Sequence, residues 1–126
     1  MTTGMTTGSI LIVDDLQENL TVLRKILSQK GYRVRLAVNG RVALKTVHKE
    51  LPDLILLDIM MPGIDGYEIV EILKQDPMTK HIPVIALSAN VLSHDIEKGK
   101  EAGFDFYLTK PLNLAQLVTV CNQLLA

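Results

Sequence analysis

The chain has 126 residues, of which 48% are hydrophobic and 21% charged, and its formal net charge is −1. This length allows one domain with its own core, and the composition is ordinary for a soluble globular protein. The balanced charge argues against general nucleic-acid binding, which usually requires an excess of basic residues.

The cysteine content, the hydrophobic runs and the amino terminus restrict the expected setting. Cys121 is the only cysteine, so no intramolecular disulfide can form, and a reducing compartment such as the cytoplasm is expected. No hydrophobic run reaches the length of a membrane span, and no signal-peptide pattern is present. Residues 1–8 repeat the sequence Met-Thr-Thr-Gly and are expected to be a disordered tail or a cloning scar, leaving residues 9–126 as the domain.

In the first half of the chain, short hydrophobic runs alternate with amphipathic segments. Strands are predicted at residues 9–13, 32–38 and 54–58. The segment after the first strand has leucines at helical spacing and ends at Gly31. Its expected buried residues are Leu16, Leu20, Leu23 and Leu27. A second helix follows Asn39 and is expected to bury Val42, Ala43, Leu44 and Val47.

The second half continues the alternation. Asp65 can cap a third helix with Ile69, Val70, Ile72 and Leu73 on its buried face. Further strands are predicted at residues 83–87 and 104–108. The helix predicted between them, at residues 93–102, has one large hydrophobic residue and an internal glycine, so we expect it to be mobile. Asn113 can cap the last helix, whose expected inward residues are Leu114, Leu117, Val118, Cys121, Leu124 and Leu125.

Five strands alternating with five helices predict an α/β fold, (βα)5, with a doubly wound parallel five-stranded sheet. The carboxyl ends of parallel strands lie at the same edge of the sheet, where such folds bind ligands. Residues at or just after four of the strand ends are therefore expected to converge there. They are Asp14, Asp15, Asp58, Ser88 and Lys110.

The expected cluster of three carboxylates indicates a cation site. At about 4 Å and an effective dielectric constant of about 20, each pair of carboxylates repels by roughly 4 kcal/mol before screening. Lys110 adds one positive charge, too little for balance, and oxygen ligands suit Mg²⁺. A carboxylate beside Mg²⁺, an ammonium and the Ser88 hydroxyl can attack a phosphoryl group, giving an aspartyl phosphate on Asp58. Taken singly, each residue could instead be a helix cap or an ordinary surface residue.

Four motifs carry a resemblance to a known family over residues 9–125. They are Val13-Asp14-Asp15, the run from Leu57 to Gly66 (LDIMMPGIDG), Leu87-Ser88-Ala89, and the run from Tyr107 to Pro111 (YLTKP). In these motifs the chain resembles the receiver domains of two-component response regulators, which have a flavodoxin-like fold. Residues 15–19 and 88–90 are similar to those of receivers attached to hybrid histidine kinases.

The resemblance implies roles for individual residues. Asp58 would accept a phosphoryl group from the phosphohistidine of a histidine kinase or a histidine phosphotransfer domain. Asp15 would bind Mg²⁺ directly, Asp14 largely through water, and the Met60 main-chain carbonyl would be a further ligand. Ser88 and Tyr107 would move on phosphorylation, and Lys110, followed by a cis Pro111, would pair with the phosphate. The response would appear at the face formed by the fourth helix, the fifth strand and the fifth helix.

The chain also departs from the common pattern of the family. Phe104 and Phe106 stand where many receivers have alanine and aspartate, and no charged residue occurs from Pro111 to Ala126. The usual salt-bridged dimer is therefore not expected. An uncharged helix face, predicted to include Val120, instead suggests contact with a second copy or an adjoining domain.

Two other classes of protein share parts of this pattern. A Mg²⁺-dependent phosphohydrolase with an aspartate nucleophile usually has Asp-x-Asp after the first strand, whereas this chain has adjacent Asp14 and Asp15. A flavodoxin-like cofactor binder needs a phosphate-binding loop there, where these carboxylates would repel the phosphate. We therefore expect a signalling module that catalyses only its own phosphorylation and dephosphorylation, without binding nucleic acid or membrane.

Overall fold

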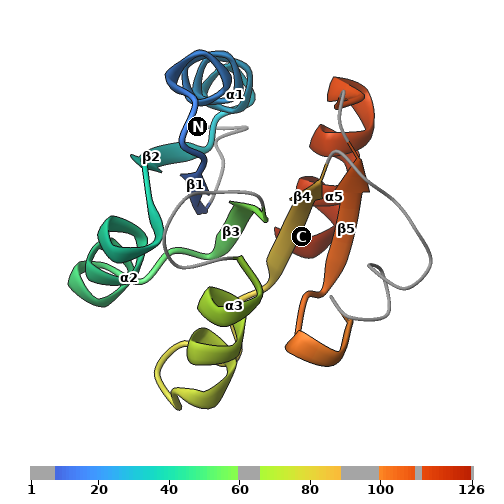
Figure 1. Cartoon of the computed structure of the whole chain (residues 1–126). Helices are drawn as coiled ribbons and strands as arrows, with labels where there is room; N and C mark the ends of the chain where they lie inside the picture. Colours follow the sequence, from blue (N-terminus) through green and yellow to red (C-terminus); the bar gives the residue numbers. More distant parts are fainter. Residues whose placement is uncertain (1–7, 60–65, 89–99, 110–111, 126) are drawn as a thin grey trace.

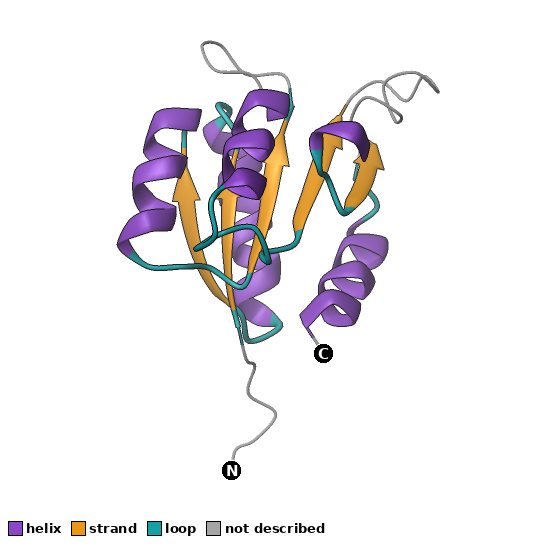
Figure 2. Cartoon of the chain, turned by 90° about the horizontal axis from the view of Figure 1, so that it is seen from below, coloured by secondary structure: helices purple, strands orange, loops and turns teal. Residues whose placement is uncertain are grey.

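The structure is a computed structural model that describes residues 8–59, 66–88, 100–109 and 112–125. Its five strands form one parallel sheet with the order β2-β1-β3-β4-β5. The strands are β1 (Ser9–Val13), β2 (Arg33–Ala37), β3 (Leu54–Asp58), β4 (Val84–Ser88) and β5 (Phe106–Thr109). All five arrows point the same way in Figure 2, so the carboxyl ends share one edge. The predicted α/β class and parallel sheet are confirmed.

Helices cover both faces of the sheet (Figure 1). The long helices within the described residues are α1 (Gln17–Gln29), α2 (Gly40–Lys49), α3 (Gly66–Gln75) and α5 (Leu114–Leu125). Helices α1 and α5 pack on one face, and α2 and α3 pack on the other. Residues 100–102 are also helical, whereas the rest of the predicted fourth helix and the predicted tail, residues 1–7, lie outside the described residues.

The three central strands are buried along their whole length because both of their faces are covered. Every residue of β1, β3 and β4 is buried. Successive side chains alternate between the faces: Leu11 and Val13 contact the α2–α3 side, and Ile10 and Ile12 contact the α1–α5 side. Each fully buried side chain of this size stabilises the fold by about 1.5–3 kcal/mol.

Several helix residues depart from the predicted positions. Leu16 is the N-cap of α1 and not part of its buried stripe, so it is exposed. Val42, Ile72 and Leu114 are also exposed, whereas Val120 is buried. The predicted apolar stripes therefore extended too far at the starts of α1, α2 and α5. At Ile72 and Val120 the predicted rotation about the helix axis was wrong. The Asp65 cap lies outside the described residues.

Other local predictions are confirmed or shifted by a short distance. Asn113 caps α5 as predicted, by accepting from the Gln116 N–H. Asn39, which was expected only to end the strand before it, accepts from the Val42 N–H and caps α2. Cys121 is fully buried, and burial raises the pKa of its thiol to about 12. The fifth strand begins two residues later than predicted, because Phe104 packs in the core on the α2–α3 side before the strand starts.

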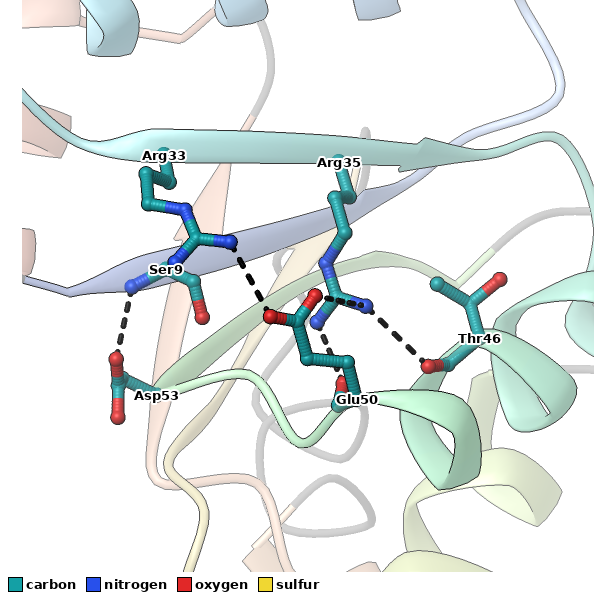
Figure 3. A network of polar contacts seen from close by, with 6 residues as sticks. All are labelled: Ser9, Arg33, Arg35, Thr46, Glu50 and Asp53. Atoms are coloured by element: carbon teal, nitrogen blue, oxygen red, sulfur yellow. Dashed lines mark hydrogen bonds and ion pairs between the residues drawn. The ribbon is translucent and has the colours of Figure 1, made fainter.

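Polar contacts join the edge strand β2 to the end of α2 (Figure 3). The Arg35 guanidinium donates to the main-chain oxygens of Thr46 and Glu50, at 3.4 and 2.6 Å. Arg33 and Arg35 also form ion pairs with the Glu50 carboxylate. The Arg35 contacts add a second hydrogen bond to the Thr46 carbonyl, which already accepts from the Glu50 N–H, and one to the carbonyl of Glu50, the C-cap residue of α2.

Lys74 forms a second polar connection, between α3 and the starts of β4 and β5. Its Nζ donates to the Ile82 carbonyl at 2.8 Å and to Asp105 Oδ2 at 2.9 Å. Asp105 Oδ2 also accepts from the Val84 N–H at 2.8 Å. One carboxylate thus joins the lysine to the edge of the sheet just before β5.

His48 forms a third connection, between α2 and the residue after α3. Its Nδ1 lies 2.8 Å from the Leu44 carbonyl and its Nε2 lies 2.9 Å from Asp76 Oδ2. Both partners are acceptors, so both contacts are hydrogen bonds only when the imidazole carries two protons. The hydrogen bond to Asp76 raises the pKa of His48, and the same bond lowers the pKa of Asp76. The imidazole is thus hydrogen-bonded at both nitrogens, although its side chain remains half exposed.

The His48–Asp76 pair predicts a pH dependence of stability. The raised His48 pKa stabilises the fold fully below pH about 6.5, the unfolded value, and this contribution is lost as the pH rises through the folded pKa. The lowered Asp76 pKa acts in the opposite direction, with loss as the pH falls through its folded value. We expect the urea midpoint of His48→Gln to lie below that of the wild-type protein at pH 6 and to approach it at pH 9. His81→Gln, at an exposed histidine, is the control; an equal His48→Gln effect at both pH values would contradict the prediction.

Candidate functional site

The three predicted carboxylates meet at the carboxyl edge of the sheet. Asp14 and Asp15 directly follow β1, and Asp58 is the last residue of the neighbouring β3. One carboxylate oxygen from each of the three lies within 4.8 Å of the others. The adjacency of β1 and β3 produces this cluster, since their register places Val13 beside Leu57 and so brings the next residues together.

Asp14 is held rigidly in this cluster. It is fully buried, and its main-chain N–H donates to the Ala37 carbonyl at 3.1 Å. Its carboxylate accepts from the Leu16 N–H at 3.0 Å and from the Asn19 side-chain amide at 3.1 Å. Asp15, in contrast, is exposed. The role of Asn19 was not predicted from the sequence, because Asp14 lies before α1 begins and helical spacing does not relate the two residues.

Asp58 is held in place by the pairing of β3 with β4. It pairs with Leu87 in the β3–β4 ladder, and the Ile59 N–H donates to the Leu87 carbonyl at 3.1 Å. The residue is only 3% exposed. A carboxylate with so little access to water needs compensating charge or hydrogen bonds. The site therefore combines an inner pair, Asp14 and Asp58, with Asp15 at the solvent side.

Ser88 and Tyr107 lie on the next two strands. Ser88 is the buried last residue of β4, beside Thr109 of β5. Tyr107 is beside Ala86, and its ring packs against the core on the α2–α3 side. The Tyr107 hydroxyl is buried and has no hydrogen-bond partner within the described part of the chain. Met60 and Lys110, the other predicted site residues, lie outside the described residues.

The donor set fits Mg²⁺. This ion takes oxygen ligands at 2.0–2.1 Å in an octahedron, so ligands on opposite sides of it are about 4.2 Å apart, and it usually retains several waters. Three carboxylate oxygens within 4.8 Å of one another can therefore share one ion after small side-chain movements or through bridging water. Asp15 and Asp58 would hold it directly, with Asp14 behind them. A bound divalent cation would offset the repulsion among the carboxylates.

No helix among the described residues is long and apolar enough to cross a membrane.

Comparisons with known proteins agree with this geometry. The profile of the family described as "Response regulator receiver domain" matches residues 10–122. The response regulator PleD of Caulobacter vibrioides is 43% identical over 104 residues, which are 82% of this chain and 23% of PleD. The chain thus spans about a quarter of that relative's length.

Two solved receiver domains have the same fold. One belongs to a signal transduction histidine kinase of Syntrophus aciditrophicus, with a TM-score of 0.88, 36% identity, and coverage of 94% of this chain and 90% of that chain. The other belongs to a sensor histidine kinase of Pseudomonas aeruginosa and has a magnesium ion coordinated in its active-site cleft. Its TM-score is 0.86, with 33% identity and coverage of 95% of this chain and 98% of that chain. From its fold, its acidic cluster and these matches together, the chain belongs to the family of response regulator receiver domains, the phosphoacceptor switches of two-component signalling.

Proposed function

We propose that Asp58 is the phosphoacceptor of this receiver domain. The observation that carries the proposal is the convergence of the Asp14, Asp15 and Asp58 carboxylates within 4.8 Å, with Asp58 buried at the end of a central strand. A nucleophile in this position is partly removed from water, yet it lies beside an exposed carboxylate that can hold a cation at the entrance.

Asp15 and Asp58 would hold Mg²⁺ directly, Asp14 would act largely through water, and the Met60 main-chain carbonyl would complete the protein's share of the ligands. The magnesium ion coordinated in the active-site cleft of the Pseudomonas aeruginosa receiver domain supports a magnesium site in this fold. When bound, the ion offsets negative charge on the phosphoryl oxygens. Asp14, with both carboxylate oxygens already accepting hydrogen bonds, is suited to orient the site rather than to exchange ligands.

The chemical step is transfer of a phosphoryl group from a phosphohistidine. A carboxylate oxygen of Asp58 forms a bond to phosphorus while the phosphorus–nitrogen bond of the donor breaks. The electron pair of that bond returns to the imidazole nitrogen, which then takes a proton from solvent. Lys110 pairs with the transferred phosphate, and the Ser88 hydroxyl, at the end of the adjacent strand, donates to a phosphoryl oxygen.

The switch runs from Ser88 to Tyr107 and on to the face of β5 and α5. Ser88 and Tyr107 lie on neighbouring paired strands, so a displacement at the end of β4 also displaces β5. The buried Tyr107 hydroxyl has no hydrogen-bond partner in the described part of the chain. Movement of this side chain would therefore break no hydrogen bond of the hydroxyl there, which supports a role for Tyr107 in the switch.

The partner is a histidine kinase or a histidine phosphotransfer domain in the cytoplasm. The likeness to two receiver domains of histidine kinases supports a receiver of the hybrid kinase type. The domain acts as a signalling module and catalyses only its own phosphorylation and dephosphorylation. A long-lived aspartyl phosphate would distinguish it from a phosphohydrolase, and absence of colour in the purified protein would distinguish it from a flavin binder.

The Asp58 assignment predicts a single site of phosphorylation. With acetyl phosphate and Mg²⁺, the wild-type protein should gain one hydroxylamine-labile phosphoryl group by intact-protein mass spectrometry. Asp58→Asn should gain none, and because it removes one of three repelling carboxylates it should be at least as stable as wild type in metal-free buffer.

Asp53→Asn is the matched control. Asp53 directly precedes β3, at the opposite end of the strand from Asp58, and its carboxylate accepts from the Ser9 N–H at 2.8 Å. An asparagine oxygen can accept the same bond, so this variant should be phosphorylated like wild type. Phosphoryl uptake by Asp58→Asn at the wild-type rate would show that the acceptor lies elsewhere.

The exposed face of α5, together with Phe106, is the proposed contact surface for a second copy or an adjoining domain. The exposed residues of α5 are all uncharged: Leu114, Ala115, Gln116, Thr119, Asn122 and Gln123. Phe106 is 40% exposed, and it shares a side of β5 with Leu108, which packs on the α1–α5 side. The surface thus has apolar area next to neutral hydrogen-bonding groups.

A contact through this face should be almost insensitive to salt, because it contains no charges to screen. With beryllofluoride, which mimics the phosphoryl group, we expect sedimentation to show self-association at both low and high salt. Leu114→Glu should weaken it at least about tenfold, whereas Val22→Glu, at an exposed position on α1, should not. Val120 is unsuitable for this test because it is buried. Dissociation in moderate salt would contradict an uncharged contact, and a monomer in every condition would eliminate the second copy and leave the adjoining domain.

A further inference from the structure

Gly66, the first residue of α3, has no backbone reason to be glycine. The glycines with positive φ among the described residues are Gly8, Gly31 and Gly103, so Gly66 has a conformation that other residues adopt freely. It is also helical, and glycine is among the poorest helix formers. Alanine would therefore be preferred at this position on local grounds alone.

The surroundings of Gly66 supply the reason. A Cβ atom at this position would lie 2.8 Å from the Ile59 Cα and 3.3 Å from the Asp58 main-chain oxygen. The Gly66 N–H also donates to the Ile59 carbonyl at 3.3 Å. The start of α3 thus rests directly on the peptide that follows the phosphoacceptor. Both close atoms belong to the main chain, so no side-chain rotation can make room for a methyl group.

The strand end cannot move freely to relieve such a contact. Asp58 is paired with Leu87, and the Ile59 N–H is bonded to the Leu87 carbonyl. A side chain at position 66 must therefore lift α3 from the sheet or turn the Asp58–Ile59 peptide. Turning this peptide moves the Asp58 side chain relative to Asp14, whose carboxylate is held by two hydrogen bonds of its own.

We propose that Gly66 is a positioning residue for the phosphoacceptor: its missing side chain lets α3 press on the Asp58–Ile59 peptide and so sets the separation of Asp58 from Asp14 and Asp15. This inference rests on the proposed function of Asp58. It goes further in assigning to α3, which contributes no described carboxylate to the cluster, the geometry of the metal and phosphoryl site.

The test compares Gly66→Ala with Gly31→Ala. Gly31, with φ of 95°, lies between α1 and the amino end of β2, away from the carboxyl edge of the sheet, so alanine strains the backbone there without touching the site. Three quantities are measured for both variants and wild type: the Mg²⁺ dissociation constant by calorimetry, the metal-free amide chemical shift of Ile59, and the midpoint of urea unfolding. Phosphorylation by acetyl phosphate is the fourth.

For Gly66→Ala we expect a shifted Ile59 amide, and Mg²⁺ affinity and phosphorylation rate each lower by on the order of tenfold, as for a displacement of less than an ångström. Gly31→Ala should lower the urea midpoint and leave the other three quantities at wild-type values. Should Gly66→Ala be unfolded in buffer, the comparison is made in trimethylamine N-oxide, which favours the compact state.

Gly66→Ala with wild-type Mg²⁺ affinity and an unshifted Ile59 amide would overturn the proposal, and so would a variant that stays unfolded in the osmolyte, since Gly66 would then serve the fold as a whole. Equal loss of Mg²⁺ affinity in Gly31→Ala would overturn it too, as a general effect of lowered stability. Failure of the wild-type protein to be phosphorylated on Asp58 would instead refute the proposed function, a result separate from all of these.

Discussion

The mutual repulsion of three carboxylates is the constraint on which the rest of the structure depends. Each pair at about 4 Å costs roughly 4 kcal/mol at an effective dielectric constant of about 20, whereas a domain is stable by only about 5–15 kcal/mol in total. The acidic groups stay together because β1 and β3 are neighbours in the middle of the sheet and are buried on both faces. The core therefore holds together a charge arrangement that is unfavourable in itself.

The polar groups that strengthen the fold lie mostly away from this site. Arg35 holds the end of α2, Lys74 ties α3 to the starts of β4 and β5, and His48 connects α2 to Asp76. These contacts pair opposite charges or satisfy carbonyls at element ends, whereas the carboxyl edge gathers like charges. The stabilising polar contacts and the acidic cluster thus lie at opposite ends of the sheet. The carboxyl edge can therefore change charge on phosphorylation while the contacts at the other end remain in place.

The strands and the acidic cluster could be predicted because fully buried runs and parallel strand ends leave a direct mark on the sequence. The rotation of each helix about its own axis could not be predicted in the same way. Helical spacing identifies a stripe but not its exact limits, and α5 has no charged residue to mark its outer side, so Val120 was placed outward and Leu114 inward. Phe104 extended the apparent strand because it is buried before β5 begins. The contacts of Asn19 and Gly66 depend on segments brought together by folding, which spacing alone does not reveal.

The central claim, that the carboxylate cluster is a strained site completed by a divalent cation, is tested most directly by the free energy of urea unfolding as a function of Mg²⁺ concentration. A ligand that binds only the folded state at a hundred times its dissociation constant adds about 2.7 kcal/mol. The account predicts an increase of this form in the wild-type protein and its loss when Asp15 is replaced by asparagine. An unfolding free energy that is independent of Mg²⁺ in the wild-type protein would contradict it, because the carboxylates would then be tolerated without a cation.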